Sequence, residues 1–178
     1  MRAWSVGHST HGLDELVALL RRHGIRQLAD IRTAPSSRRH PHFNRGALAR
    51  ELSVRGIAYV HLAALGGRRR PAPDSPNGGW LNASFRGYAD YAMTAEFAAA
   101  IARLRALAAE APTAMMCAEA LWWRCHRRMV ADRFVLAGDE VCHIGPDGRA
   151  TAHRLTPFAA VSEGRLVYPP PERGSTSS

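Results

Sequence analysis

The most reactive stretch of the chain is residues 115–128, MMCAEALWWRCHRR, in which an apolar run ends at Cys117. The residues that follow supply a carboxylate, two indoles, a second thiol, an imidazole and three guanidinium groups. Glu119 is the candidate general acid or base, because partial burial beside the two tryptophans would raise the pKa of its carboxyl group. A salt bridge to a neighbouring arginine is the alternative role for this side chain.

Cys117 is a candidate nucleophile, because nearby arginines and a following helix N-terminus would lower the pKa of its thiol. The stretch CAEALWWR has no glycine to close the tight oxyanion loop of cysteine phosphatases and sulfurtransferases, which favours a buried, unreactive thiol. His126 and the cysteines are metal-ligating residue types, but no C-x-x-C or H-x-x-x-H spacing organises them. We therefore expect neither a metal nor an organic cofactor. Arg127 is expected to bind an anion from the start of a helix, with Cys125 packed below it.

The charge of the chain points to anionic ligands. The 178 residues include 24 basic side chains, all of them arginine, and the formal net charge is +9. Such a balance favours nucleic acid or nucleotides as partners, with a solvated basic surface as the alternative. Arginines and aromatic rings are interleaved in residues 32–45 and again in 68–91, a combination that suits phosphates and stacked bases. The ligand-binding candidates there are Arg32, Arg38, Asn44, Arg86 and Tyr88; in the 115–128 stretch they are Trp122, Cys125, His126 and Arg127.

A further anion site is expected at residues 7–10, GHST, between a strand and the start of a helix. Backbone N–H groups there, with the hydroxyls of Ser9 and Thr10, can hold a phosphate, although simple helix capping is an equal alternative. His8 is a catalytic candidate, with a buried core imidazole as the other interpretation. The glycines match neither a Walker loop nor a dinucleotide-binding fingerprint.

The elements that must position these residues follow a recurring pattern of helix, glycine and strand. Helices are expected from residue 13 to Gly24, from 45 to Gly56, and over 94–111 and 125–138. Strands are expected over 2–7, 57–62, 113–117 and 140–144, and from about residue 25. This alternation predicts an α/β protein: a three-layer sandwich with a mostly parallel, about five-stranded sheet and Rossmann-like alternation.

In such sheets ligands bind beyond the carboxyl ends of the strands, and polar residues follow all five predicted strands. The catalytic candidates Glu119, Asp30, His8 and Cys117 are therefore expected to lie near one crevice. We expect residues 1–168 to form a single domain, with a long functional insertion at 66–93 and a disordered tail at 169–178. The segment after Gly145 is expected to form a hairpin or an extended arm on the sheet edge.

The sequence also indicates the cellular compartment of the protein. No N-terminal signal peptide and no membrane span is evident, so we expect no membrane partner. Three cysteines are an odd number and too few for a disulfide framework. These features favour the reducing cytoplasm.

Several fragments together resemble the bacterial and archaeal family known as domain of unknown function 488. They are GHST, DIRTAPSSRR, FN, HLAALGG, FRGYADYAM, MMCAE and CHR, in that order, between about residues 4 and 144. The resemblance implies a small α/β protein with shared residues at the strand ends, but it implies no activity. The positions that match the family pattern are His8, Ser9, Asp30, Arg32, Pro35, Asn44, Gly66, Gly67, Arg86, Cys117, Glu119, Cys125, His126 and Arg127. The chain departs from the pattern at ALWW, where the family usually has a polar stretch.

These observations favour an enzyme that acts on nucleic acid or on a nucleotide-like phosphorylated ligand. Hydrolytic or lyase chemistry at a glycosidic bond is its most concrete form, with Glu119 or Asp30 as the acting carboxylate. Two alternatives remain open at this stage: a cysteine-dependent sulfur- or phosphoryl-transfer enzyme, and a non-catalytic nucleic-acid-binding module.

Overall fold

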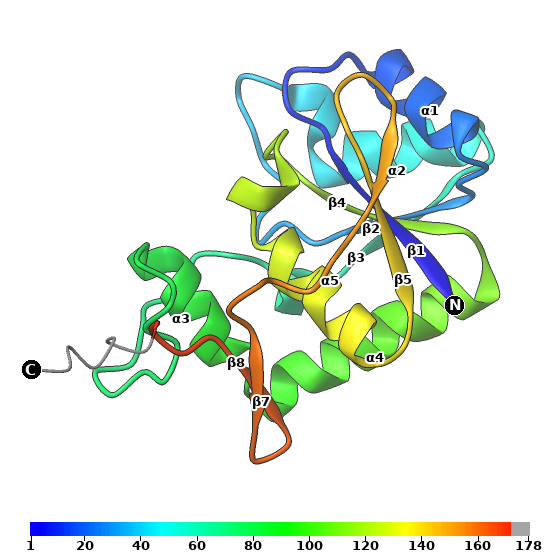
Figure 1. Cartoon of the computed structure of the whole chain (residues 1–178). Coiled ribbons are helices and arrows are strands. Elements are labelled where there is room, and N and C mark those ends of the chain that lie inside the picture. Colours follow the sequence, from blue (N-terminus) through cyan, green and yellow to red (C-terminus); the bar gives the residue numbers. More distant parts are fainter. Residues whose placement is uncertain (172–178) are drawn as a thin grey trace, which may run out of the picture.

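A six-stranded sheet forms the centre of the computed structural model, which describes residues 1–171 (Figure 1). Its order is β3-β2-β4-β1-β5-β6, and every pair is parallel except β5 with β6. The strands are β1 (Arg2–Gly7), β2 (Gln27–Asp30), β3 (Ala58–His61), β4 (Thr113–Cys117), β5 (Glu140–Ile144) and β6 (Ala150–Ala152). The α/β class and the mostly parallel sheet are therefore as expected. The sixth strand comes from the segment after Gly145, which pairs at the sheet edge.

Helices cover both faces of this sheet. They are α1 (Leu13–Arg22), α2 (Arg45–Val54), α3 (Ala83–Tyr91), α4 (Ala95–Glu110) and α5 (Arg127–Leu136). Successive strand residues point to opposite faces, so Leu28 and Met116 pack with α1 and α2, whereas Ala29 and Met115 pack with α4 and α5. Every residue of β2 and β4 is buried, as expected for strands covered on both faces, although Gln27, Asp30 and Thr113 are polar.

The strand order differs from the 3-2-1-4-5-6 order of the Rossmann fold, because β4 lies between β1 and β2. The chain leaves β1 toward β2 on one side and leaves β4 toward β5 on the other. Two adjacent strands therefore send their connections in opposite directions. The connection after β1 runs through α1 on one face of the sheet and the connection after β4 runs through α5 on the other face, so a crevice opens between them beyond the carboxyl ends of β1 and β4.

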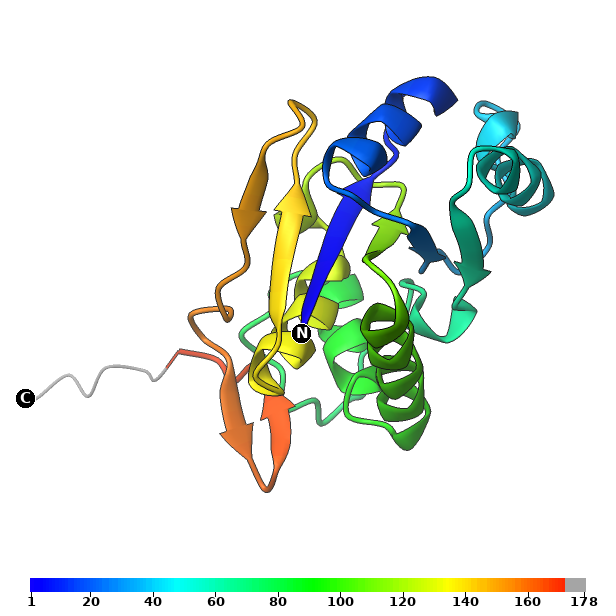
Figure 2. The same cartoon turned by 90° about the vertical axis from the view of Figure 1, so that its right-hand side faces the viewer.

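The insertion at 66–93 contains α3, which the sequence analysis did not resolve. Asn82 begins this helix, and its side-chain oxygen accepts hydrogen bonds from the Ser84 and Phe85 amides. The insertion packs against the C-terminal segment, since the Gly79 amide donates to the Tyr168 carbonyl at 2.8 Å. A small hairpin of β7 (Ala160–Ser162) and β8 (Arg165–Val167) extends from this region (Figure 2).

A buried carboxylate anchors the C-terminal segment to α5. Asp132 accepts hydrogen bonds from the His153 ring at 2.9 Å, from the amide and hydroxyl of Thr156 at 2.8 Å, and from the Tyr168 hydroxyl at 2.8 Å. His153 in turn accepts from His143, which accepts from the Ser5 hydroxyl at 2.6 Å. The network joins the central strand β1 to segments more than 130 residues away in the chain.

Of the predicted disordered tail at 169–178, residues 172–178 lie outside the described part of the chain. In residues 1–171 no helix has the length and apolar character needed to span a membrane.

Candidate functional site

A cavity of about 910 Å³ lies at the carboxyl ends of β1, β2 and β4, and we call it the site pocket. It is formed by the loops that follow these strands, together with the loop after β3 and the start of α5. Its lining residues are His8, Ser9, Thr10, Arg32, Thr33, Ala34, Ser36, Ser37, His40, Gly67, Arg68, Cys117, Ala118, Glu119, Ala120 and His126. The pocket thus joins the loops that the sequence analysis singled out.

Strands β1 and β4 continue to pair past their ends and form one wall of the pocket. The His8 amide donates to the Cys117 carbonyl at 2.9 Å, and the Ser9 amide donates to the Ala118 carbonyl at 3.0 Å. A side chain at Gly7 would put its Cβ 2.0 Å from the Glu119 carbonyl oxygen. Glycine at this position therefore allows the two chains to approach each other and brings Glu119 close to His8.

Asp30 is fully buried behind the pocket, where it orients Arg32. The Asp30 oxygens accept from the Arg32 Nε at 2.8 Å and from Nη2 at 2.5 Å, and the Tyr59 hydroxyl adds a third bond at 2.7 Å. Asp30 is not among the residues that line the site pocket. This placement suits a positioning residue better than the acting carboxylate that the sequence suggested, whereas Arg32 does reach the pocket.

His8 is buried between the arginine and an aromatic ring. Its Nδ1 lies 3.0 Å from the Ser9 carbonyl and must donate, so its Nε2 accepts from Arg32 Nη1 at 3.2 Å. The ring stacks on Phe43 at 4.2 Å. Burial and then the Arg32 charge lower the pKa of His8 to about 4. The imidazole is therefore neutral near pH 7, and both ring nitrogens are engaged, which favours a positioning role over proton transfer.

Glu119 lines the site pocket as an exposed side chain, and Oε1 accepts from the Leu121 amide at 3.4 Å. The expected burial beside the tryptophans is wrong for this residue. Trp122, in the short helix η3 (Trp122–Arg124), instead stacks on the His143 ring with centroids 4.0 Å apart and planes 4° apart. Trp122 is absent from the pocket lining, so its indole holds η3 against β5.

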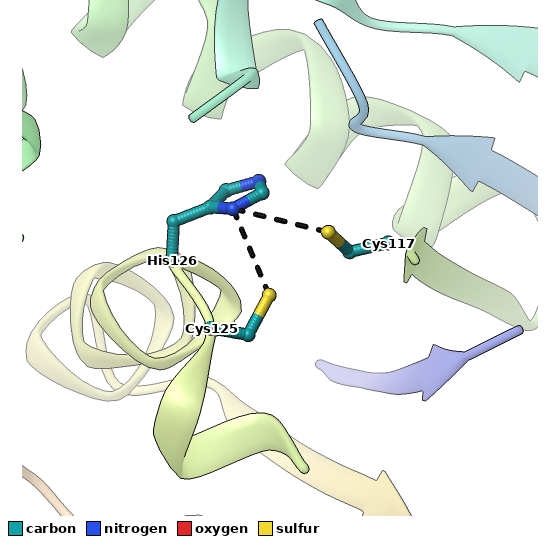
Figure 3. Close-up of side chains that lie close together, drawn as sticks. All are labelled: Cys117, Cys125 and His126. Atoms are coloured by element: carbon teal, nitrogen blue, oxygen red, sulfur yellow. Dashed lines mark hydrogen bonds between the residues drawn. The ribbon is translucent and has the colours of Figure 1, made fainter. Parts of the chain in front are cut away.

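The side chains of two cysteines and a histidine lie close together (Figure 3), and Cys117 and His126 of this group line the site pocket. His126 Nδ1 lies 3.9 Å from the Cys117 sulfur and 3.6 Å from the Cys125 sulfur, although the two cysteines come from β4 and from the turn before α5. Together with Tyr88, Arg124, Gly67 and Arg68, these three residues also line a smaller adjoining cavity of about 140 Å³. We call Cys117, Cys125 and His126 the thiol–imidazole cluster.

The two thiols of the cluster have opposite pKa shifts. Burial alone would raise the pKa of Cys125, but a hydrogen bond with Cys117 and the charge of Arg127 outweigh burial and lower it to about 6. The hydrogen bond with Cys125 and burial raise the pKa of Cys117 to about 12. The lowered pKa gives Cys125 the thiolate character, whereas the cysteine considered as a nucleophile from the sequence was Cys117, for which an unreactive buried thiol was favoured.

Arg127 does not have the expected position in the crevice. Its side chain is 1% exposed, and Nη2 donates to the carbonyl oxygens of Glu119 and Ala120. Its Nε lies 3.4 Å from the Cys125 sulfur. Arg127 thus holds the chain after β4 and supports the Cys125 thiolate, and the predicted phosphate contact does not fit this burial.

The remaining ligand-binding candidates lie outside the site pocket. Arg38 is exposed and Arg86 is half-buried. The Asn44 side chain accepts from the Ser37 amide at 2.5 Å, so it shapes the loop that carries Ser36 and Ser37. Tyr88 is buried against the core, and its hydroxyl donates to the Leu65 carbonyl at 2.7 Å.

The sequence analysis missed some residues that line the site pocket, and one signal could have identified them. Each lies in the loop that follows β2, at the same edge of the sheet as the predicted candidates. The missed polar residues are Thr33, Ser36 and Ser37, whereas His40 and Arg68 lie in the arginine-rich segments that the sequence had already indicated.

The family model described as Domain of unknown function DUF488 matches residues 12–134. Comparison with curated proteins and with solved structures found no match to the chain. The matched span includes Arg32, Glu119 and the whole thiol–imidazole cluster, whereas His8, Ser9 and Thr10 of the pocket lie before it. Because the model covers more than half of the chain, this protein belongs to the DUF488 family.

Proposed function

We propose that this protein is an enzyme that binds a nucleotide-like phosphorylated ligand, or a segment of nucleic acid, in the site pocket. Hydrolytic or lyase chemistry, at a glycosidic bond in its most concrete form, is the proposed reaction. The proposed setting is the cytoplasm, which fits the three free cysteines.

The observation that carries the proposal is the chemistry of the pocket lining. Arg32 and Arg68 contribute guanidinium groups, and five serine or threonine side chains contribute hydroxyls. Among the lining residues of the described chain, Glu119 supplies the one carboxylate. Guanidinium and hydroxyl donors suit phosphate oxygens, and the basic surface of a chain with net charge +9 would attract such ligands.

The guanidinium of Arg32 is preorganised for binding an anion. The bidentate contact with Asp30 and a 2.8 Å bond from Nη2 to the Phe43 carbonyl hold the guanidinium in place. A donor held in this way loses little side-chain entropy when a ligand binds. Glu119 lies at the same pocket as a free carboxylate and is the proposed general acid or base.

A cysteine-dependent sulfur- or phosphoryl-transfer reaction is the second candidate. The observation in its favour is the low pKa of Cys125, about 6, beside a pocket that carries arginines. In that case the nucleophile is the Cys125 thiolate, with Cys117 as its hydrogen-bond donor.

Binding is tested by fluorescence anisotropy with a labelled single-stranded oligonucleotide at low and moderately high salt. We expect affinity to fall by orders of magnitude as salt rises, because phosphate contacts release counterions. Arg68→Gln removes an exposed guanidinium from the pocket and is expected to weaken binding by roughly tenfold or more. Arg26→Gln is the matched control, since Arg26 is exposed at the opposite end of the sheet.

Competition by a nucleoside monophosphate separates a pocket ligand from binding to the basic surface. Inhibition of oligonucleotide binding in the parent protein but not in Arg68→Gln supports the pocket. Salt-independent binding, no binding at low salt, or an equal loss in both arginine variants contradicts the proposal.

A further inference from the structure

We propose that Cys117, Cys125 and His126 bind a zinc ion whose fourth coordination position faces the smaller cavity that adjoins the site pocket. The sequence spacing gave no hint of this site, because the two cysteines are eight positions apart and the histidine directly follows the second one. The fold brings the three side chains together, with their ligand atoms all within 4.8 Å of one another. The inference concerns metal binding alone and does not depend on the proposed reaction.

The distances within the thiol–imidazole cluster match the edges of a zinc tetrahedron. With Zn–S near 2.3 Å and Zn–N near 2.0–2.1 Å, sulfur and nitrogen ligands are roughly 3.5 Å apart. The His126 Nδ1 is 3.6 Å from the Cys125 sulfur and 3.9 Å from the Cys117 sulfur. The two nitrogen–sulfur distances are thus close to those around a single zinc ion, and all three ligand atoms lie within 4.8 Å of one another.

The histidine of the cluster is already in the tautomer that a metal requires. Its Nε2 lies 3.2 Å from the Ile31 carbonyl oxygen, which can only accept, so Nε2 carries the proton. Nδ1 then presents its lone pair to the two sulfurs. A histidine ligand that donates its other N–H to a carbonyl is the usual arrangement around protein-bound zinc, since this bond orients the ring.

The residues around His126 leave little freedom for its ring. A Cβ atom at Gly67 would lie 3.0 Å from Nδ1, so glycine permits the close approach of the backbone. The Tyr88 ring packs on the imidazole with centroids 5.0 Å apart, and its hydroxyl is bonded to Leu65. The imidazole is therefore held by its neighbours on several sides.

The ligand set selects the type of ion and leaves one position open. Two sulfurs and one imidazole nitrogen suit zinc better than magnesium or calcium, which prefer oxygen. Three protein ligands with a fourth open position are typical of catalytic rather than structural zinc. All three cluster residues line the cavity of about 140 Å³, together with Glu119. A water or a ligand atom can therefore complete the coordination there.

A disulfide between Cys117 and Cys125 is the competing use of the two sulfurs. Such a disulfide would use both thiols. It would give no reason for His126 Nδ1 to lie close to both sulfurs. The close contact of Nδ1 with both sulfurs therefore favours the metal.

The test measures zinc in the full-length protein purified without chelator, by atomic emission spectrometry. We expect equimolar zinc in the parent protein and in Cys142→Ser, because Cys142 lies on β5 and is not part of the cluster. We expect loss of most of this zinc in Cys125→Ser and in His126→Ala. Urea unfolding of each variant checks that it is folded.

A second measurement uses the parent protein alone and so does not depend on the folding of variants. Cobalt added to the chelator-treated, reduced protein should give a thiolate charge-transfer band and intense visible bands of a tetrahedral site, and equimolar zinc should abolish them. The inference is overturned if no zinc co-purifies and cobalt gives no such bands. It is also overturned if Cys142→Ser loses zinc as the cluster variants do, or if mass spectrometry shows a Cys117–Cys125 disulfide in metal-free protein that fails to bind zinc after reduction.

Discussion

Asp30 and Arg32 form a bidentate ion pair beneath the site pocket, although a single residue separates them in the chain. Side chains two apart at the end of an extended segment lie on the same side, and this local geometry brings the carboxylate and guanidinium together. Asp30 is 0% exposed and Arg32 is 8% exposed, so the pair is almost fully removed from water. The buried Asp30 carboxylate therefore fixes the position of the Arg32 guanidinium at the pocket wall.

Asp30→Asn should destabilise the protein more than any substitution at an exposed ion pair. The change leaves a buried guanidinium with a neutral partner, which typically costs about 3–5 kcal/mol in the free energy of unfolding. Urea denaturation measures this loss. Asp14→Asn is the control, because Asp14 pairs with Arg55 at the surface, where solvent screens the interaction. Equal changes in the two variants would contradict the role assigned to Asp30.

Glu119→Gln should lower the turnover of a substrate by roughly a hundredfold or more, the usual scale for loss of a general acid or base. Its unfolding midpoint should stay that of the parent, because the side chain is exposed. Steady-state kinetics on a nucleotide or oligonucleotide substrate is the measurement, with Glu163→Gln on the β7–β8 turn as the control. Full turnover by Glu119→Gln would assign the chemistry to another residue.

Acid should destabilise the protein through His143. Burial and then the charges of His153 and Arg127 lower the pKa of His143 in the folded protein to about 2. His143 therefore takes up a proton near pH 6.5 in the unfolded chain but stays neutral at this pH in the folded protein. The stabilisation by the neutral ring is complete above pH 6.5, and it decreases as the pH falls below that value.

The free energy of unfolding, measured in urea between pH 7 and pH 5, should fall with a slope to which this residue adds up to about 1.4 kcal/mol per pH unit. In His143→Asn this part of the slope should disappear, whatever the absolute stability of the variant. An unchanged slope would show that other groups account for the acid sensitivity.

Asp132→Asn should release the C-terminal segment. Four hydrogen bonds converge on the Asp132 oxygens, and an amide can accept at only one of its two side-chain atoms. Limited proteolysis followed by mass spectrometry should therefore show faster cleavage within residues 153–168 than in the parent. Asp147→Asn, in the exposed turn before β6, should leave the cleavage pattern unchanged.

Gly67→Ala should weaken zinc binding while leaving the three cluster residues in place. The added Cβ would lie 3.0 Å from His126 Nδ1 and would push the ring away from the sulfurs. Competition with a chromophoric zinc chelator gives the affinity, and Gly12→Ala is the control because its Cβ would meet no atom within 4 Å. Unchanged affinity in Gly67→Ala would contradict the role assigned to the close approach of Gly67 to the ring.

Local sequence patterns were sufficient to predict most of the elements that form the sheet and its helices. The helices before Gly24 and Gly56 end where these glycines adopt positive φ values of 66° and 74°, as the pattern indicated. The rule that ligands bind at carboxyl strand ends also identified His8 and Glu119 as neighbours of one pocket. Strand order was not predictable, because the connection before β4 is long enough to reach several positions in the sheet.

The parts of the site that sequence reasoning placed incorrectly are those decided by burial. Nothing in CHRR distinguishes an arginine that enters solvent from one that turns inward, yet Arg127 is buried and donates hydrogen bonds to the carbonyls of Glu119 and Ala120. The thiol–imidazole cluster was missed for a similar reason. The short helix η3 folds the chain back between Cys117 and Cys125, and no spacing rule for metal ligands describes that turn.

The hydrogen bonds of Asp132 also bear on the point during synthesis at which helix α5 can pack against the sheet. Helix α5 leaves the ribosome before His153, Thr156 and Tyr168, so its buried carboxylate has no partners at that time. Docking of the helix on the sheet would then bury an unpaired charge, which is strongly unfavourable. Arrested nascent chains that end before His153 should therefore leave Cys125 open to alkylation. The thiol–imidazole cluster would then take its final arrangement only after the C-terminal segment has emerged.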